Sequence, residues 1–255
     1  MAFKLIILLV FGFHLNVLAQ LKGTLTYKQT INDKNLSSGP YNLDYVIYFN
    51  NERSIEFPVV KPISKGYNVV EVDENRSSIF MNSGKSSFIY KNFKMNELYF
   101  SDFIYPLKRL LITDTLANFN WKITSEKADV LGYACIKATT IFRGRSYVAW
   151  FTRQIDVKNG PWKFCGLPGL VVKVSDTDNI FKYELNAVNL KADFDSSILQ
   201  IPNDFANQER ISHESFMKVY LKMLADDEIK NREVSYDIYG TSSSKITHAE
   251  KKEKF

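Results

Sequence analysis

The feature that most constrains the fold is a succession of short runs, from Leu21 to about Leu190, in which apolar and polar residues alternate. The runs are rich in aromatic and β-branched residues, and turn-forming segments separate them, as is typical of strands. Examples are YNLDYVIYF, SFIYKNF, ELYFSDFI, RLLIT and NWKITSE. No repeat of fixed period is visible, which argues against a propeller or a solenoid. We therefore predict a mainly β fold (α+β at most), a curved antiparallel meander sheet or half-barrel.

A helix is predicted late in the chain, where Ser212 is a suitable N-cap. The apolar residues that follow have the spacing of one helical face: Phe216, Val219, Tyr220, Met223 and Leu224. Such a stripe favours packing of the helix on the sheet over a groove for a partner.

Residues 1–19 have the parts of a secretory signal: Lys4, an apolar run from Leu5 to about Phe13, and a VLA junction. The apolar run is shorter than the about 20 residues that a membrane anchor needs. No Cys follows it that could carry a lipid. We expect cleavage before Gln20 and no transmembrane segment afterwards. The expected location is the periplasm, the outer-membrane surface or the medium.

The formal net charge of +5 is small and spread along the chain. It gives no basic patch of the kind that binds nucleic acid, so we expect no nucleic-acid partner. Residues 20–240 are predicted to form a single β-rich domain. Residues 241–255 lack periodicity and are dense in Lys and Glu, so they are expected to be a flexible, charged tail.

The segment from Gly132 to Thr152 predicts a β-hairpin around the sequence RGRS. Gly144 suits the first central position of a two-residue type II′ turn, which would place Phe142 opposite Tyr147. The residues that then share one apolar face are Ile136, Ala138, Phe142, Tyr147 and Phe151. We expect that face to belong to the core.

The sequence GPWKFCGLPGLVV, residues 160–172, combines turn-forming and strongly apolar residues. Its LPGL portion fits a type II turn, because Pro168 fixes φ and Gly169 allows positive φ. Leaving Trp162, Phe164 or Leu167 in water would forfeit about 2 kcal/mol each. We therefore expect an ordered loop that folds over the body of the protein. The residues of this structural motif are Gly160, Pro161, Gly166, Leu167, Pro168, Gly169 and Leu170.

Together with GYACIKA and GRSYVAWFT upstream, the GPWKF and GLPGLV sequences resemble the GLPGLI (Porph_ging) family of exported Bacteroidota proteins. The resemblance covers roughly Asn120 to Glu184, and Val171 stands where the family name has Ile. It implies a β-rich envelope or secreted protein without an assigned activity. Family members are often encoded beside TonB-dependent outer-membrane receptors, so the resemblance also implies such a receptor as a partner.

The sequence has no catalytic or metal-binding motif, and we name no catalytic residue, cofactor or metal. His213 and His248 lie near no Gly-flanked Ser or reactive Cys, which a nucleophilic triad would need. Asp176 and Asp178 lack the Gly and Glu of a calcium loop and are better interpreted as part of a hairpin turn. Paired catalytic carboxylates leave no spacing signature, so a secreted peptidase or glycosidase remains the alternative function.

The candidate binding residues are Trp150, Trp162, Arg143 and Arg145. The tryptophans could stack on carbohydrate, although burial in a sheet is the common role of Trp. The arginines flank the hairpin tip and could capture phosphate or carboxylate, although exposed charge is ordinary there. We favour a non-catalytic cell-envelope protein that offers an apolar concavity or a strand edge to a ligand, a peptide or a membrane-protein partner. Periplasmic lipoprotein carriers are a fold-level analogy.

Both cysteines of the chain, Cys135 and Cys165, lie in the segment that carries the resemblance. In the predicted hairpin Cys135 lies opposite Gln154, at the end where the chain leaves for the loop. The loop returns to the sheet at that end, so we expect a Cys135–Cys165 disulfide in an oxidising compartment. Two buried free thiols are the alternative.

Overall fold

The computed structural model describes residues 21–34, 40–59, 61–63, 67–73, 76–81, 87–104, 108–116, 119–236 and 252–253. The predicted signal peptide lies outside these residues, as does all of the predicted tail except Lys252 and Glu253. In the described part, no helix is both long enough and apolar enough to cross a membrane.

Strands dominate the described residues. They are β1 (Lys22–Ile31), β2 (Tyr41–Asn50), β3 (Arg53–Pro58), β4 (Lys61–Ile63), β5 (Tyr67–Asp73), β6 (Arg76–Met81), β7 (Ile89–Asn92), β8 (Glu97–Ile104), β9 (Lys108–Thr115), β10 (Lys122–Val130), β11 (Tyr133–Phe142), β12 (Arg145–Thr152), β13 (Leu170–Asp176), β14 (Phe181–Asn189) and β15 (Arg210–Ser212). The helical elements are two 3₁₀ turns, η1 (Ser196–Ile198) and η2 (Asn203–Phe205), and the helix α1 (His213–Tyr236).

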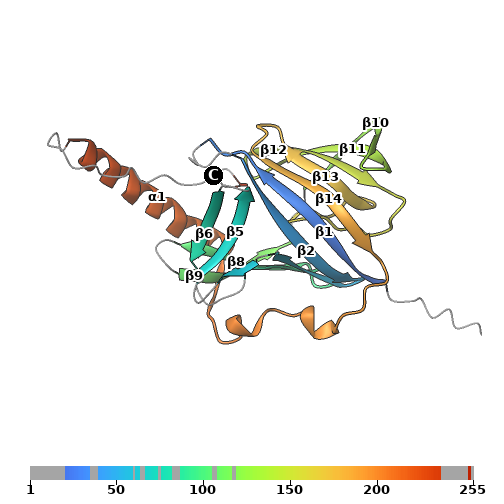
Figure 1. Cartoon of the computed structure of the whole chain (residues 1–255), viewed down its shortest axis with the longest axis horizontal. Coiled ribbons are helices and arrows are strands. Elements are labelled where there is room, and N and C mark those ends of the chain that lie inside the picture. The colour runs from blue at the N-terminus through green and yellow to red at the C-terminus, as the bar shows by residue number, and fades with distance from the viewer. Residues whose placement is uncertain are drawn as a thin grey trace, which may run out of the picture.

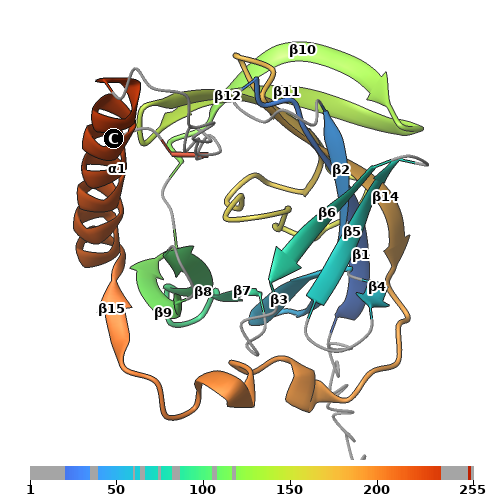
Figure 2. The ribbon, with the colours of Figure 1, turned by 60° about the vertical axis from the view of Figure 1, so that its left-hand side comes forward.

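Twelve of these strands form one open sheet in the order β10-β11-β12-β13-β14-β1-β2-β3-β7-β8-β9-β15. Adjacent strands in this sheet are antiparallel, except that β15 runs parallel to β9. Strands β4, β5 and β6 form a separate small sheet. The long sheet curls around an interior, and α1 projects from its β9–β15 end (Figures 1 and 2). The predicted mainly β, curved antiparallel fold with a late helix is confirmed.

The interior of the curl holds the largest apolar core, as the alternation of the strands predicts. Leu25 and Tyr27 of β1 are fully buried, and every second residue of β12 is buried as well. The chain between β12 and β13, residues 153–169, enters this interior and is here called the inner loop (Figure 2). Its Phe164 ring contacts the rings of Tyr147 and Tyr183, so the loop and the inner faces of the strands form one core.

The β11–β12 hairpin forms, but its predicted register is wrong by two residues. Phe142 pairs with Arg145, and the turn consists of Arg143 and Gly144. Their φ values of 43° and 73° are both positive, which indicates a type I′ turn in place of type II′. Because side chains alternate with a period of two, an even slip leaves both faces of the hairpin unchanged. Ala138, Phe142, Tyr147 and Phe151 are accordingly buried, and Ile136 is half-buried.

The start of α1 packs on the sheet as predicted. Ser212 caps the helix, since its Oγ accepts a hydrogen bond of 3.1 Å from the backbone N–H of Ser215. Val219, which we assigned to the packing face, is 48% exposed, and Met217 is buried in its place. The buried face therefore lies slightly around the helix from the predicted stripe. The residues that form this core with β8 and β9 include Phe216, Met217, Tyr220, Leu98, Phe100 and Ile112.

The predicted disulfide is absent, because Cys135 and Cys165 are both free and buried. The topological argument failed because the inner loop turns into the interior instead of running along the end of β11. Cys165 forms an isolated β-bridge with Asn159, and its carbonyl accepts a hydrogen bond of 2.9 Å from Trp121 Nε1. Burial raises the pKa of Cys135 to about 11 and also raises the pKa of Cys165, so both favour the protonated thiol.

Gly169 is required at the end of the inner loop, but for a reason other than a type II turn. The backbone N–H of Gly169 donates to the carbonyl of Leu167 at 2.9 Å, which makes a three-residue turn at Pro168. Its φ is +149°, and a Cβ at this position would lie 2.0 Å from the carbonyl oxygen of Thr152. Gly166 also has positive φ, +87°, but a Cβ there would meet nothing within 4 Å.

We expect Gly169→Ala to lower the free energy of unfolding by roughly 2–4 kcal/mol, because the methyl group displaces the backbone of β12. Gly166→Ala is the matched control and should cost about 1 kcal/mol, the backbone penalty alone. Urea unfolding of both variants measures the difference. Equal losses would show that the close approach of Gly169 to Thr152 does not exist.

Candidate functional site

A cavity of about 260 Å³ lies inside the curl, between the inner loop, strands β3, β7 and β8, and the first turn of α1. Its lining combines apolar residues with an unusual number of charged ones. The Asp, Glu, Lys and His residues of the lining are Glu56, Asp102, Lys163, His213, Lys252 and Glu253. Because charged side chains are rarely buried unless they are paired, this cavity is the candidate functional site.

The inner loop places Trp162 and Lys163 on the cavity wall. Trp162 adopts φ +51°, a left-handed conformation that is uncommon for a bulky residue. Its backbone N–H donates to Glu56 Oε2 of β3 at 2.7 Å, and this bond holds the unusual backbone against the sheet. Its ring lies edge-on to the rings of Phe142 and Phe164. Strained backbone is typical of functional positions, and here it aims the next side chain, Lys163, into the cavity.

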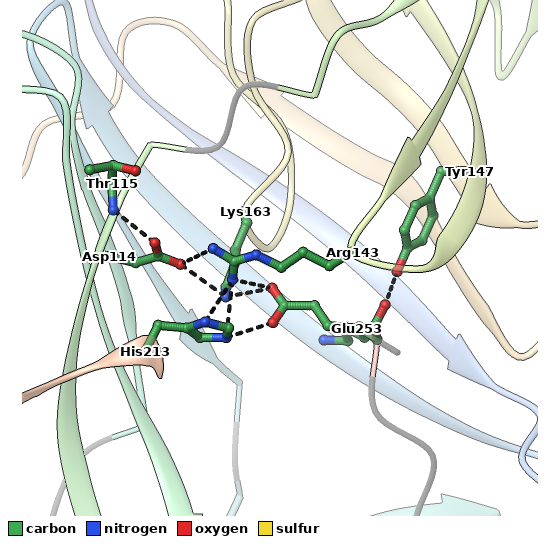
Figure 3. Close-up of polar contacts among 8 residues, drawn as sticks. Asp114, Thr115, Arg143, Tyr147, Lys163, His213 and Glu253 are labelled. Atoms are coloured by element: carbon green, nitrogen blue, oxygen red, sulfur yellow. Dashed lines mark hydrogen bonds and ion pairs between the residues drawn. The ribbon is translucent and has the colours of Figure 1, made fainter. Parts of the chain in front are cut away.

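Three side chains from separate parts of the chain donate to the carboxylate of Glu253 (Figure 3). Lys163 Nζ is 2.7 Å and Arg143 Nη1 is 3.1 Å from Glu253 Oε1. His213 Nε2 is 2.7 Å from Glu253 Oε2. We call Arg143, Lys163 and His213 the donor triad. Lys163 and Glu253 are 3% and 8% exposed, so these contacts are shielded from water.

Asp114 of β9 completes the cluster. Its Oδ2 accepts from Arg143 Nη2 at 2.8 Å and lies 3.7 Å from Lys163 Nζ, while its Oδ1 accepts from the backbone N–H of Thr115 at 2.9 Å (Figure 3). Asp114, Glu253 and the donor triad are here called the charged cluster. Two carboxylates thus balance the charges of Arg143 and Lys163.

The environment of the charged cluster shifts the pKa values of its members. Burial alone would raise the pKa of Glu253, but the hydrogen bond from His213 and the charges of Lys163 and Arg143 outweigh it and lower the pKa to about 2. Burial lowers the pKa of Lys163, against the opposing effect of Glu253. Burial raises the pKa of Glu56, another lining residue of the cavity, despite the nearby charges of Lys91 and Lys252.

Lys252, the neighbour of Glu253, is held on both its backbone and its side chain. Its carbonyl accepts a hydrogen bond of 2.5 Å from the hydroxyl of Tyr147 (Figure 3). Its ammonium lies 5.6 Å from the ring centroid of Trp162 and 5.0 Å from that of Tyr183, which is within cation–π range. Lys252 and Glu253 were expected to lie in a solvated tail, but both contact the interior of the protein.

The predicted binding residues fall in different places. Arg143 belongs to the charged cluster, and Trp162 lines the cavity. Arg145 is fully buried and pairs with Asp176 at 2.7 Å and Asp178 at 3.2 Å, so its contacts hold the β13–β14 turn to the hairpin. Trp150 is half-buried on the other face of β12, away from the cavity lining.

Sequence reasoning missed Asp114, Lys163, His213 and Glu253. The sequence predicts no catalytic role for His213, because no Gly-flanked Ser or reactive Cys lies near it. The one local signal was Lys163, a charged residue between Trp162 and Phe164 in a loop expected to be buried. Within the residues that the structure describes, no group of three or more His, Cys, Asp or Glu side chains is arranged to hold a metal.

Fold and site together define a β-rich domain built around a charged internal cavity. Residues 93–209, a little under half of the chain, match the family model described as N-glycanase peptide, N-terminal domain (PNGase F-II). This segment contains Asp114, Arg143 and Lys163. No curated protein matches the sequence.

Two solved structures of PNGF-II, in space groups P21 and C2, resemble the chain with a TM-score of 0.50 and 19% sequence identity. The match covers 80% of this chain but 34% and 32% of those chains, so the chain spans about a third of their length. At this identity the likeness concerns the fold alone. A LolA superfamily protein from Nitrosomonas europaea gives a TM-score of 0.31 at 10% identity, which is too low to support the analogy with lipoprotein carriers.

The resemblance to the GLPGLI family is wrong. The family model that matches is that of the PNGase F-II N-terminal domain. It matches residues 93–209 of this chain, which include the whole segment on which the resemblance was based. The GLPGLV sequence is explained by local packing, since Gly169 must lie against Thr152 and the apolar residues fill the interior. The expected TonB-dependent receptor depended on that resemblance and is not proposed further.

The lowered pKa of Glu253 predicts a pH dependence of stability. Because its pKa falls from 4.5 to about 2 in the folded chain, ionised Glu253 stabilises the fold above pH 4.5, and this contribution is lost as the pH falls toward 2. We expect Glu253→Gln to lower the free energy of unfolding by roughly 2–3 kcal/mol at neutral pH. The gap from the unsubstituted chain should close between pH 4.5 and 2. Denaturant unfolding across this range measures it.

Glu209→Gln is the matched control, because Glu209 is exposed and its substitution should change stability by less than about 0.5 kcal/mol. A gap for Glu253→Gln that did not change with pH would contradict ionic anchoring of this carboxylate.

Proposed function

We propose that this chain is an exported, non-catalytic binding domain whose cavity holds a carboxylate group of its ligand. The observation that carries the proposal is the convergence of Arg143, Lys163 and His213 on one buried carboxylate. The N-terminal segment with the pattern of a secretory signal supports export.

The charge balance of the cavity explains why it would select an anion. Without Glu253, the charged cluster would retain Arg143 and Lys163 against Asp114 alone, an excess of one positive charge. Leaving a buried charge uncompensated costs several kcal/mol, so an anionic group is needed in this position. The donors come from fixed elements: a type I′ turn, the inner loop and the first residue of α1. They therefore form a preorganised carboxylate site.

The comparisons support a domain role. The chain is related to the N-terminal domain of PNGase F-II, and it spans about a third of the length of the solved PNGF-II chains. The N-glycanase activity in that family's name is not proposed for this chain. The carboxylates of the cavity have engaged partners: Glu253 is bound by the donor triad and Glu56 accepts from Trp162. Carboxylates with such partners are suited to binding a charged group and less suited to proton transfer.

Glu253→Ala empties the carboxylate position and allows a direct test. Propionate at about 100 mM should raise the melting temperature of this variant by roughly 3–5 °C, because it binds the folded state alone. Propionamide, which has the same shape without the charge, should have no such effect. The unsubstituted chain, in which Glu253 already holds the position, should not respond.

A second variant fixes the location of the effect. Adding Lys163→Met to Glu253→Ala should abolish the response to propionate. If propionate stabilised all three chains equally, the carboxylate site would be disproved.

A carboxylate-dependent hydrolase is the second candidate, and one observation favours it. Glu56 and Glu253 line the same cavity, and their pKa values are shifted in opposite directions, up for Glu56 and to about 2 for Glu253. Opposite shifts in one cleft are typical of a general acid paired with an ionised carboxylate. We rank this function second because Glu253 is already neutralised by the donor triad.

The two candidates differ in their response to Glu56→Gln. We expect no hydrolysis of chromogenic glycosides or peptides that depends on Glu56. Loss of a general acid would reduce turnover by about 100-fold or more. Such a loss in Glu56→Gln, with turnover retained in the cavity control Asp102→Asn and both variants folded, would favour the hydrolase and contradict the binding domain.

A further inference from the structure

Lys252 and Glu253 are contacted in the manner of a bound peptide. A carboxylate, a backbone carbonyl and an ammonium group of this dipeptide each meet a separate partner of suitable chemistry. The donor triad binds the carboxylate, the hydroxyl of Tyr147 donates to the carbonyl, and two aromatic rings face the ammonium. Recognition of backbone and side chains together is how peptide sites obtain affinity and sequence preference.

The charges that line the cavity are also complementary to the dipeptide, with basic groups around its glutamate and an acidic group near its lysine. The basic residues Arg143 and Lys163 surround Glu253, whereas Lys252 lies near the buried carboxylate of Glu56 and its charge acts to lower the pKa of that group. A peptide with the two charges exchanged would put a carboxylate beside Glu56 and an ammonium beside Lys163. The like charges would then disfavour binding.

We propose that the cavity is a binding site for a peptide segment in which a lysine precedes a glutamate, and that Lys252-Glu253 of this chain occupies it as an internal competing ligand. This inference rests on the carboxylate-binding function proposed above and adds the ligand class. A segment of the same chain competes at an effective concentration on the order of millimolar. A peptide from another molecule therefore binds far more weakly while the internal segment is in place.

The space beside the dipeptide fits a longer ligand. With Lys252 and Glu253 in position, a cavity of about 260 Å³ remains. The polar residues Ser87, Ser101 and Asp102 are among those that line this remaining volume. Gln29 lies two residues before the lining residue Ile31 on β1; it is fully buried, and its amide nitrogen and oxygen have no hydrogen-bond partner among the described residues. Buried amides are normally satisfied, so this part of the interior has unused capacity for polar groups.

The test measures binding of a fluorescein-labelled peptide, His-Ala-Glu-Lys-Lys-Glu-Lys-Phe, to the full chain by fluorescence anisotropy. Its sequence is that of residues 248–255. We expect a dissociation constant at least tenfold lower for Glu253→Gln than for the unsubstituted chain, because the internal competitor is weakened. Glu209→Gln, which changes an exposed carboxylate, should bind the peptide as the unsubstituted chain does.

Two altered peptides examine the recognition itself. Replacing the second glutamate of the peptide by glutamine, or exchanging it with the preceding lysine, should weaken binding to Glu253→Gln at least tenfold. Thermal unfolding checks that the variant is folded. If Glu253→Gln does not fold, Lys252→Ala serves in its place, because it removes the ammonium contact and leaves Glu253 intact. A smaller gain in peptide affinity, about threefold or more, is then expected.

Three results would overturn the inference: equal peptide affinity for the variant and the unsubstituted chain, binding insensitive to the altered peptides, or association of the variant into dimers that exchange the segment. The propionate experiment separates this failure from failure of the carboxylate site. Propionate stabilisation of Glu253→Ala without peptide binding would leave the carboxylate site in place and remove the peptide. If neither propionate stabilisation nor peptide binding is observed, the carboxylate site and the peptide site are both disproved.

Discussion

The ammonium group of Lys91 is the interaction on which the interior of this protein depends. It is 1% exposed and donates to Asn159 Oδ1 at 3.0 Å, to the Gly160 carbonyl at 2.8 Å and to the Phe164 carbonyl at 3.1 Å. Burial lowers the pKa of Lys91, so the three oxygens must compensate for the loss of hydration. All three belong to the inner loop, so one side chain of β7 fixes the path of that loop.

The inner loop fills volume that the curled sheet would otherwise leave empty. A sheet of twelve strands that curls on itself encloses more space than the side chains of its inner face can fill. Here the chain between β12 and β13 supplies the missing volume, with Trp162, Phe164 and Leu167 all buried. Filling a core with a loop also brings backbone polar groups inside, which is why Lys91 and Glu56 are needed to bond them. The buried charges of the site thus follow from the architecture.

The fold could be predicted from the sequence because its signals are local. The alternation of apolar and polar residues predicts the strands, and the sequence around RGRS predicts the hairpin. The register was missed because Arg143 adopts positive φ beside Gly144, a conformation that the sequence alone does not favour for Arg. The faces were still correct, because a slip of two residues preserves alternation. The Cys135–Cys165 disulfide was predicted wrongly because Lys91, which lies far away in the sequence, decides the direction of the inner loop.

The candidate site had much weaker signals. Its members come from β9, the β11–β12 turn, the inner loop, α1 and residue 253, and the sequence places no two of them within a recognisable motif. Arg143 and Trp162 were selected for their chemistry, but nothing in the sequence pairs Lys163 with Glu253, ninety positions later. A buried ion pair of this kind is specified by the whole fold, so it becomes visible only when the fold is known.

The two-against-two charge balance of the charged cluster has a consequence for how a ligand can enter. An incoming carboxylate that replaces Glu253 exchanges one anion for another, so the net charge of the interior does not change. Little counterion is taken up or released at the cluster, and the exchange constant should depend only slightly on ionic strength. A surface patch of Lys and Arg behaves in the opposite way, because salt screens it. Under the proposed function, the cavity therefore discriminates between anions by their size and hydrogen-bond geometry and not by net charge.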